Sequence, residues 1–295
     1  MALSHYIMAV MYDRMGQLDK AVEEYKRALK ADYANPVIHL NLAATYLYQN
    51  NFDKAVEELK LASSFDPQSA EPHAILALIY SLQKKGDLAS AEYEAALKNA
   101  SRLQPKNIEI YKNLGIFYLQ QKNFQAAQNV YQMVLELSSA DPEAHFYLAD
   151  VYNELGDKQK AEDHLKKALG LKADYPEALN FLGYLYVEQN KNLDKAEVMI
   201  KKALEQDSDN GAYVDSLGWL YFRKGKIDAA KKQLIRASGL LEDPVIFDHL
   251  GDVYLAVGDE ENALLYWEKS LKLDPAQAAV REKLDRLQKQ LSEKN

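Results

Sequence analysis

Histidine, the side chain most often used for general acid–base catalysis and for metal binding, occurs six times in this chain. Four of the histidines stand four residues before an alanine, at the same place in a recurring pattern: His5, His39, His73 and His145. A position that recurs in this way favours a role in packing. His164 and His249 lie apart from that series, without the spacing of a zinc site or of a catalytic triad. We therefore expect neither a metal site nor a catalytic histidine.

Other catalytic patterns are also missing from the sequence. Cysteine is absent, which excludes thiol catalysis, disulfides, a cysteine-bound metal and a lipidated cysteine in this chain. Nine of the 12 glycines fall at only two places in this recurring pattern, and the glycines do not form a phosphate-binding loop. Acidic pairs are plentiful, but nothing in the sequence would raise the pKa of one of them. We predict no enzymatic activity and no cofactor.

The elements that position these residues follow from an internal repeat. Alanine recurs every 33 to 36 residues, at Ala21, Ala55, Ala91, Ala127, Ala161, Ala196, Ala230 and Ala263. A tyrosine precedes each alanine by nine or more residues, and Ala or Gly stands three residues before each tyrosine, as in the pair Ala43 and Tyr46. One supersecondary unit is therefore copied eight times.

Each copy contains two amphipathic helices separated by a polar turn. Apolar residues have helical spacing in both halves, such as Leu182 and Tyr186 in one stretch and Ala196 and Ile200 in the next. Proline marks the borders, because it is tolerated in the first turn of a helix and ends a helix elsewhere. Four prolines open a first helix (Pro36, Pro142, Pro176, Pro244) and three follow a second one (Pro67, Pro105, Pro275).

The repeated residues resemble the tetratricopeptide repeat family from Ala2 to Pro275. The fourth copy carries the pattern as Tyr111, Leu114, Gly115, Tyr118, Ala127, Tyr131 and Val134. The resemblance implies an all-α fold: a right-handed α-α superhelix, or solenoid, of about eight helix-turn-helix repeats, because stacked neighbours bury the apolar stripe that a single pair leaves exposed.

The expected solenoid spans residues 1–275, and a C-terminal capping helix follows at 276–295. We place the repeats at 2–35, 36–69, 70–107, 108–141, 142–175, 176–210, 211–243 and 244–275. Two repeats depart from the pattern. In the third, Ala91 and Gly86 indicate an extended turn and an extended second helix, and in the sixth one residue is added before Leu193. Because Ala2 already stands at the first position of a repeat, the chain also reads as a fragment of a longer one.

Charge and hydropathy narrow the classes of partner. The formal net charge of −8 disfavours nucleic-acid binding, which depends on Lys and Arg neutralising phosphates. No stretch approaches the roughly 18 apolar residues of a membrane span. The later repeats resemble arrays from bacterial envelope-associated proteins, so we expect a soluble chain in the bacterial cytoplasm or periplasm. The absence of cysteine fits both compartments.

In the resembled fold the first helices line a concave groove, and the residues at the groove positions supply the best functional clue. From the fourth repeat onward these positions combine aromatic rings with polar and acidic groups, which favours a partner that has Lys or Arg beside apolar side chains. The alternative is that the rings merely pack between adjacent first helices. The predicted partner-binding residues are Asn113, Phe146, Tyr147, Asp150, Asn180, Phe181, Tyr184, Asp215, Trp219, Phe222 and Asp252.

The leading hypothesis is a non-enzymatic scaffold or adaptor that binds a peptide or a helix of a partner protein in its groove. Two alternatives stay open. The chain is the substrate-recruiting arm of a larger enzyme or of a secretion or envelope-assembly complex, or it is a structural protein that self-associates into a homo-oligomer.

Overall fold

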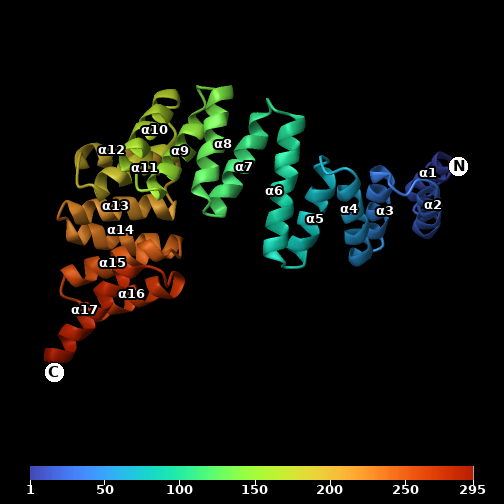
Figure 1. The fold of residues 1–295 in the computed structure, drawn as a ribbon. Helices are drawn as coiled ribbons and strands as arrows, with labels where there is room; N and C mark the ends of the chain where they lie inside the picture. Colours follow the sequence, from blue (N-terminus) through green and yellow to red (C-terminus); the bar gives the residue numbers. More distant parts are fainter. Residues whose placement is uncertain (295) are drawn as a thin grey trace. The chain divides into compact units, whose positions relative to one another are not determined.

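The computed structural model describes residues 1–294 and folds them into helices joined by short turns, with no strand in that range (Figure 1). The predicted all-α helical-repeat fold is confirmed. Contacts divide the chain into two compact units: the first is Met1–Leu137 and the second begins at Ser138. Asn295, the last residue of the predicted capping helix, lies outside the described residues.

The first unit contains four helical pairs. The two helices of each pair pack against each other, and the second helix of one pair packs against the first helix of the next. The helices are α1 (Ala2–Arg14), α2 (Leu18–Ala31), α3 (Pro36–Tyr48), α4 (Phe52–Phe65), α5 (Glu71–Leu82), α6 (Gly86–Leu103), α7 (Ile108–Gln120) and α8 (Phe124–Leu137).

The second unit repeats this arrangement and adds one helix. Here the first helices also contact each other directly, α11 with α13 and α13 with α15, and α17 packs on α16. The helices are α9 (Pro142–Glu154), α10 (Lys158–Leu171), α11 (Pro176–Glu188), α12 (Leu193–Gln206), α13 (Gly211–Arg223), α14 (Ile227–Leu240), α15 (Pro244–Ala256), α16 (Glu260–Leu273) and α17 (Ala278–Lys294).

The helix ends follow the sequence signals. Pro36, Pro142, Pro176 and Pro244 each stand in the first turn of a first helix, as expected. In front of three of them the side chain of an Asn or Asp accepts hydrogen bonds from backbone N–H groups of the first turn: Asn35, Asp141 and Asp243. These caps satisfy amides that have no partner inside the helix.

The turn inside each repeat has one residue with left-handed backbone geometry. That residue is Gly16, Asn50, Lys84, Lys122, Gly156, Asn190, Gly225 or Gly258. The backbone N–H that follows it donates to the carbonyl of the repeat's tyrosine, for example from Asn51 to Tyr46 at 2.8 Å. In the sixth repeat Asn192, a second left-handed residue, is the extra residue predicted before Leu193.

The third repeat corrects one sequence prediction. Its turn is not extended, because the Lys85 N–H donates to the Tyr80 carbonyl at 2.9 Å as in the other repeats. Ala89, rather than the exposed Ala91, therefore occupies the repeat position. The added residues all lie in α6, which has 18 residues where α4 has 14. Four residues make about one helical turn, so the insertion preserves the face that packs inward.

Small residues let the two helices of a repeat approach closely. The repeat alanines of the second unit, Ala161, Ala196, Ala230 and Ala263, are fully buried. In the last repeat the indole of Trp267, which is also buried, packs directly on Gly251, where an added Cβ would overlap the ring. These contacts hold the first helices of the second unit in a row.

Candidate functional site

The row of first helices in the second unit contains a cavity of about 410 Å³. Side chains of α9, α11, α13 and α15 line it, together with the turn that precedes α15. The lining includes six of the eleven residues predicted from the sequence: Phe146, Asp150, Asn180, Phe181, Tyr184 and Asp215.

The aromatic wall of the cavity is half-buried rather than fully exposed. The Phe146 ring lies 6.2 Å from that of Phe181, edge to face, and 5.3 Å from each of Tyr147 and Tyr175. Phe146 and Phe181 therefore pack on each other and also line the cavity. Tyr147 supports Phe146 from beside it and does not line the cavity.

Trp219 and Phe222 do not line the cavity. Trp219 is only 8% exposed. Its ring stacks between His249, at 4.0 Å, and Phe222, at 4.9 Å, and its Nε1–H donates to Glu188 at 2.7 Å. The expectation of an exposed indole in the groove is wrong, because the residue after Gly218 is covered by its neighbours in α11 and α15.

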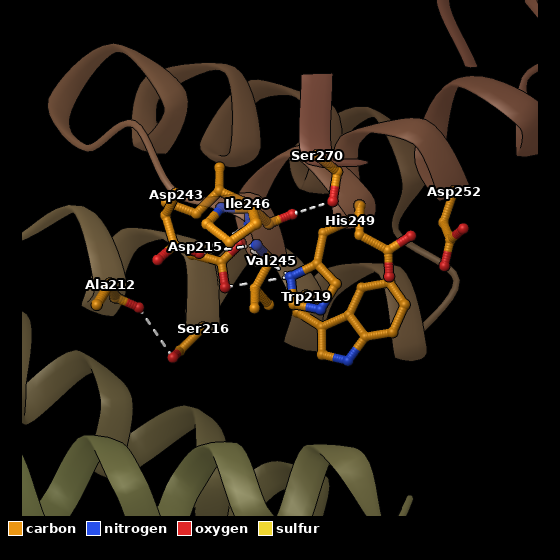
Figure 2. Close-up of polar contacts among 12 residues, drawn as sticks. Ala212, Asp215, Ser216, Trp219, Asp243, Val245, Ile246, His249, Asp252 and Ser270 are labelled. Carbon is orange, nitrogen blue, oxygen red and sulfur yellow. Dashed lines mark hydrogen bonds and ion pairs between the residues drawn. The ribbon is translucent and has the colours of Figure 1, made fainter. Parts of the chain in front are cut away.

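A buried ion pair connects α13 to α15 beside the cavity. The Nδ1–H of His249 donates to the two carboxylate oxygens of Asp215 at 2.9 and 3.1 Å, and Figure 2 shows this contact beside the Trp219 ring. Burial lowers the pKa of His249, but Asp215, Asp248 and Asp252 outweigh it and raise the pKa overall. The carboxylates therefore favour the protonated form of the imidazole. The sequence analysis missed this pair, although its 34-residue separation is one repeat.

The carboxylate of Asp252 forms an ion pair with a side chain of the last helix. The Lys283 ammonium donates to Asp248 at 2.8 and 3.0 Å and to Asp252 at 2.8 Å. Burial and the neighbouring Asp248 raise the pKa of Asp252, while Lys283 opposes this shift. Asp252 does not line the cavity, and Lys283 already supplies a cation to it.

Two polar groups in the cavity wall lack such partners. The Asp150 carboxylate makes no hydrogen bond or ion pair to any residue within 1–294, and burial, with a smaller effect of Glu154, raises its pKa to about 6. The Oδ1 atom of Asn180 is buried and accepts no hydrogen bond from the described part of the chain. Asp150 therefore offers acceptor capacity to the cavity, whereas Oδ1 of Asn180 is a buried acceptor without a donor, which is costly.

Asn113, the remaining predicted residue, belongs to the first unit. It lies on α7 and its side chain is exposed. The cavity in the second unit does not include it.

The histidines have structural partners that the sequence analysis did not identify. In the first three repeats the imidazole lies 2.6 Å from a glutamate 19 residues later, in the pairs His5–Glu24, His39–Glu58 and His73–Glu92. In the fifth repeat that partner is another histidine, and the Nδ1 atoms of His145 and His164 are 3.0 Å apart. Within residues 1–294, no three His, Asp or Glu side chains are grouped so that they could hold a metal ion.

Comparison with known proteins gives two family matches. Residues 4–217 match the model of the C-terminal domain of cilia and flagella-associated protein 70, and residues 246–277 match a tetratricopeptide repeat model. None of the described helices is long and apolar enough to cross a membrane.

Two curated relatives match part of the sequence. Both are BBSome complex member BBS4: the Bos taurus protein is 32% identical over 100 residues and the Mus musculus protein 34% over 89 residues. These matches cover 33% and 30% of this chain, and the chain spans less than a fifth of either relative, 19% and 17%.

Solved structures show the same fold at low sequence identity. A tetratricopeptide repeat protein from Parabacteroides merdae is 20% identical, with a TM-score of 0.64 over 86% of this chain and 98% of the other. The Cut9–Hcn1 hetero-tetramer of APC/C matches with 18% identity and a TM-score of 0.62 over 92% of this chain and 52% of the other.

Proposed function

Because this chain belongs to the tetratricopeptide repeat proteins, in the family of the cilia and flagella-associated protein 70 C-terminal domain, we propose that it is a non-enzymatic scaffold whose second unit binds a segment of a partner protein. The bound segment lies along α9, α11, α13 and α15 and carries basic and apolar side chains.

The 410 Å³ cavity is the observation that carries this proposal. It combines half-buried rings, which supply apolar contact area, with carboxylates that favour basic groups. Proteins of similar sequence or fold are named as members of the BBSome and of the APC/C hetero-tetramer, and this supports a role within protein assemblies.

The proposal is tested by filling the cavity without removing a core contact. Ala212 is exposed and lines the cavity, so Ala212→Phe places a ring there. Ala279→Phe is the matched control, because Ala279 is an exposed alanine of α17 away from the cavity. Peptides selected from a random display library on the intact chain are then measured by fluorescence anisotropy against the three proteins.

We expect selected peptides to be rich in Lys or Arg beside apolar residues. Their affinity should fall at least tenfold with Ala212→Phe and stay unchanged with Ala279→Phe. Failure to select any peptide, or equal affinity for the wild type and Ala212→Phe, would refute binding at this surface.

A further inference from the structure

Successive first helices are joined by one recurring side-chain contact. Each first helix has a small residue, Ala or Gly, three residues before the tyrosine of its repeat. The contact joins the residue three positions before this small residue in one repeat to the residue two positions before it in the next repeat. In the first unit the Asn41 amide donates to the Tyr6 hydroxyl at 3.0 Å. In the second unit the same register gives His249 with Asp215. Lys283 of α17, which follows the last repeat, makes an analogous contact with Asp248, although the residue two positions after it is Asp285 and not a small one.

Two of these junctions in the second unit contain a basic side chain supplied by the later helix. At the junction of α13 and α15 it is His249, and between α15 and α17 it is Lys283. Lys283 also reaches Asp252, the residue that follows the small residue Gly251. Each carboxylate on the inner side of these junctions thus has a basic partner within the chain.

The two preceding junctions lack that basic side chain. Between α9 and α11 the contact is made by two rings, Phe146 and Phe181. Between α11 and α13 the residue opposite Asn180 is Ser216, whose hydroxyl donates instead to the Ala212 carbonyl at 3.0 Å. This contact explains why Oδ1 of Asn180 is left without a donor.

Asp150 also receives no hydrogen bond from the next first helix, at the junction of α9 and α11. It follows Ala149 as Asp252 follows Gly251, so it occupies the repeat position that Lys283 neutralises in the last repeat. At α11 the residue corresponding to Lys283 is Phe181, which carries no charge. The cavity lies where these two junctions meet, and Asp150 and Asn180 are among its lining residues, although Oδ1 of Asn180 is itself buried.

We infer that the cavity is a recognition site for one basic side chain, lysine or arginine, of the bound segment. Its cation takes the place that Lys283 holds at the last junction and donates hydrogen bonds to Asp150. Its aliphatic part lies against the rings of Phe146, Phe181 and Tyr184, a surface that favours cations both by contact area and by the charge distribution of the rings. This inference rests on the proposed function, since the basic side chain belongs to the partner segment.

The electrostatics of the cavity agree with this assignment. Burial raises the pKa of Tyr184, and the carboxylates of Glu188, Asp215, Asp248 and Asp243 raise it further. Asp150, Glu177 and Asp243 line the cavity as well, and these carboxylates favour a cation there. A cation that enters the cavity loses water of hydration but gains charge-assisted hydrogen bonds. These are stronger than hydrogen bonds between neutral groups.

The test uses single capped residues as probes, so that it does not require a known partner. N-acetyl-arginine-N-methylamide and its lysine analogue are titrated into the full chain at pH 7.5, and Kd is measured from amide chemical-shift changes. The citrulline and norleucine analogues are the neutral controls of similar shape. We expect each basic probe to bind at least fivefold more tightly than its neutral control.

Two variants connect the preference to the named residues. Asp150→Asn should abolish the preference for the basic probes, whereas Asp285→Asn, at an exposed aspartate of α17, should retain it. Phe181→Lys places an ammonium where Lys283 stands in the last repeat, so it should pair with Asp150 and weaken binding of both basic probes. Equal binding of basic and neutral probes, the absence of saturable binding, or a preference that survives Asp150→Asn would each overturn the inference.

These outcomes are separable from those of the peptide experiment. If library peptides depend on Ala212 while the basic probes show no preference, the inference fails and the scaffold function stands. If the basic probes bind in an Asp150-dependent way while no library peptide is selected, the cation site stands and the scaffold function fails.

Discussion

Asp150 is held in a place where its ionisation opposes folding. Its pKa rises from 3.8 to about 6 on folding, mainly because of burial. Between these values the unfolded chain releases the proton and the folded chain keeps it, so this group lowers stability as pH rises from 3.8 to 6. We therefore predict that Asp150→Asn raises the free energy of unfolding at pH 7.5 by about 2 kcal/mol, measured by urea denaturation.

The gain should shrink as the pH falls. At pH 4 the folded wild type carries a neutral Asp150, which resembles asparagine, and the two proteins should then differ little. A loss of stability in Asp150→Asn at pH 7.5 would mean that the carboxylate has a partner in the folded chain. A gain would show that the ionised carboxylate destabilises the folded chain.

The pair of His145 and His164 replaces the His–Glu pair found in the first three repeats. Burial lowers the pKa of both imidazoles, and that of His164 falls to about 4, with His145 and Lys167 adding to the shift. Below pH 6.5 these histidines bind protons in the unfolded chain but stay neutral in the folded chain. Acidification from pH 6.5 to 4 therefore reduces the free energy of unfolding. Glutamate at position 164 would restore the repeated pair.

We predict that His164→Glu stabilises the second unit by about 1 kcal/mol at pH 5, a figure reduced for solvent screening. With glutamate beside it, the His145 imidazole should be favoured as a cation, a contribution that is complete below pH 6.5 and declines as pH rises above it. Thermal unfolding at pH 5 and pH 8 measures the difference. His164→Gln is the control, since it removes the buried His164 imidazole without adding a carboxylate, so its gain at pH 5 should be smaller than that of His164→Glu.

At the scale of residues, the repeat period was enough to place Phe146, Phe181 and Tyr184 on one surface, because each position of a repeat has a fixed direction. It was not enough for Trp219. Whether a ring at that position lines the cavity or is covered depends on the side chain that the next first helix presents, here His249. The partners of Asp215 and Asp252 were missed for the same reason, since each lies about one repeat away in sequence.

At the scale of elements, the turn between the two helices of a repeat imposes a left-handed residue. Lys122 adopts φ of 53° there, where four of the repeats have glycine. A side chain with a Cβ pays about 1 kcal/mol for this geometry. We predict that Lys122→Gly stabilises the first unit by roughly 0.5 kcal/mol, after the added flexibility of the unfolded chain is subtracted.

Urea denaturation of the two proteins measures that difference. Lys167→Gly, at an exposed position inside α10, is the control and should destabilise by about 1 kcal/mol, because glycine is unfavourable within a helix. An equal effect of both substitutions would show that the turn geometry at Lys122 imposes no strain.

The third repeat shows why the turn is a better guide to register than composition. Gly86 suggested a turn glycine and Ala91 a repeat alanine, yet Lys84 is the left-handed residue and Ala89 is the packed one. Two alanines within three residues allow either register. The choice is made in three dimensions, where His73 reaches Glu92 at the same 19-residue separation as in the first two repeats.

At the scale of the whole molecule, the stability of a repeat array is approximately a sum over repeats and over contacts between neighbours. Substitutions at equivalent positions of different repeats should therefore reduce stability more where neighbouring helices cover the residue. Met11 and Ile79 both stand two residues after the small residue of their repeat, within the same unit. Ile79 is 2% exposed on α5, which packs between α4 and α6, whereas Met11 on α1 is 52% exposed.

We predict that Ile79→Ala costs about 2 to 4 kcal/mol and Met11→Ala less than about 0.5 kcal/mol, because only the first substitution leaves a cavity. Denaturant titration of the intact chain, followed by circular dichroism, measures both in one background. Similar costs would mean that Met11 is covered in solution, so that the open face of α1 takes part in an association between molecules. Dilution distinguishes that case, since such a cost would decrease as the protein concentration is lowered.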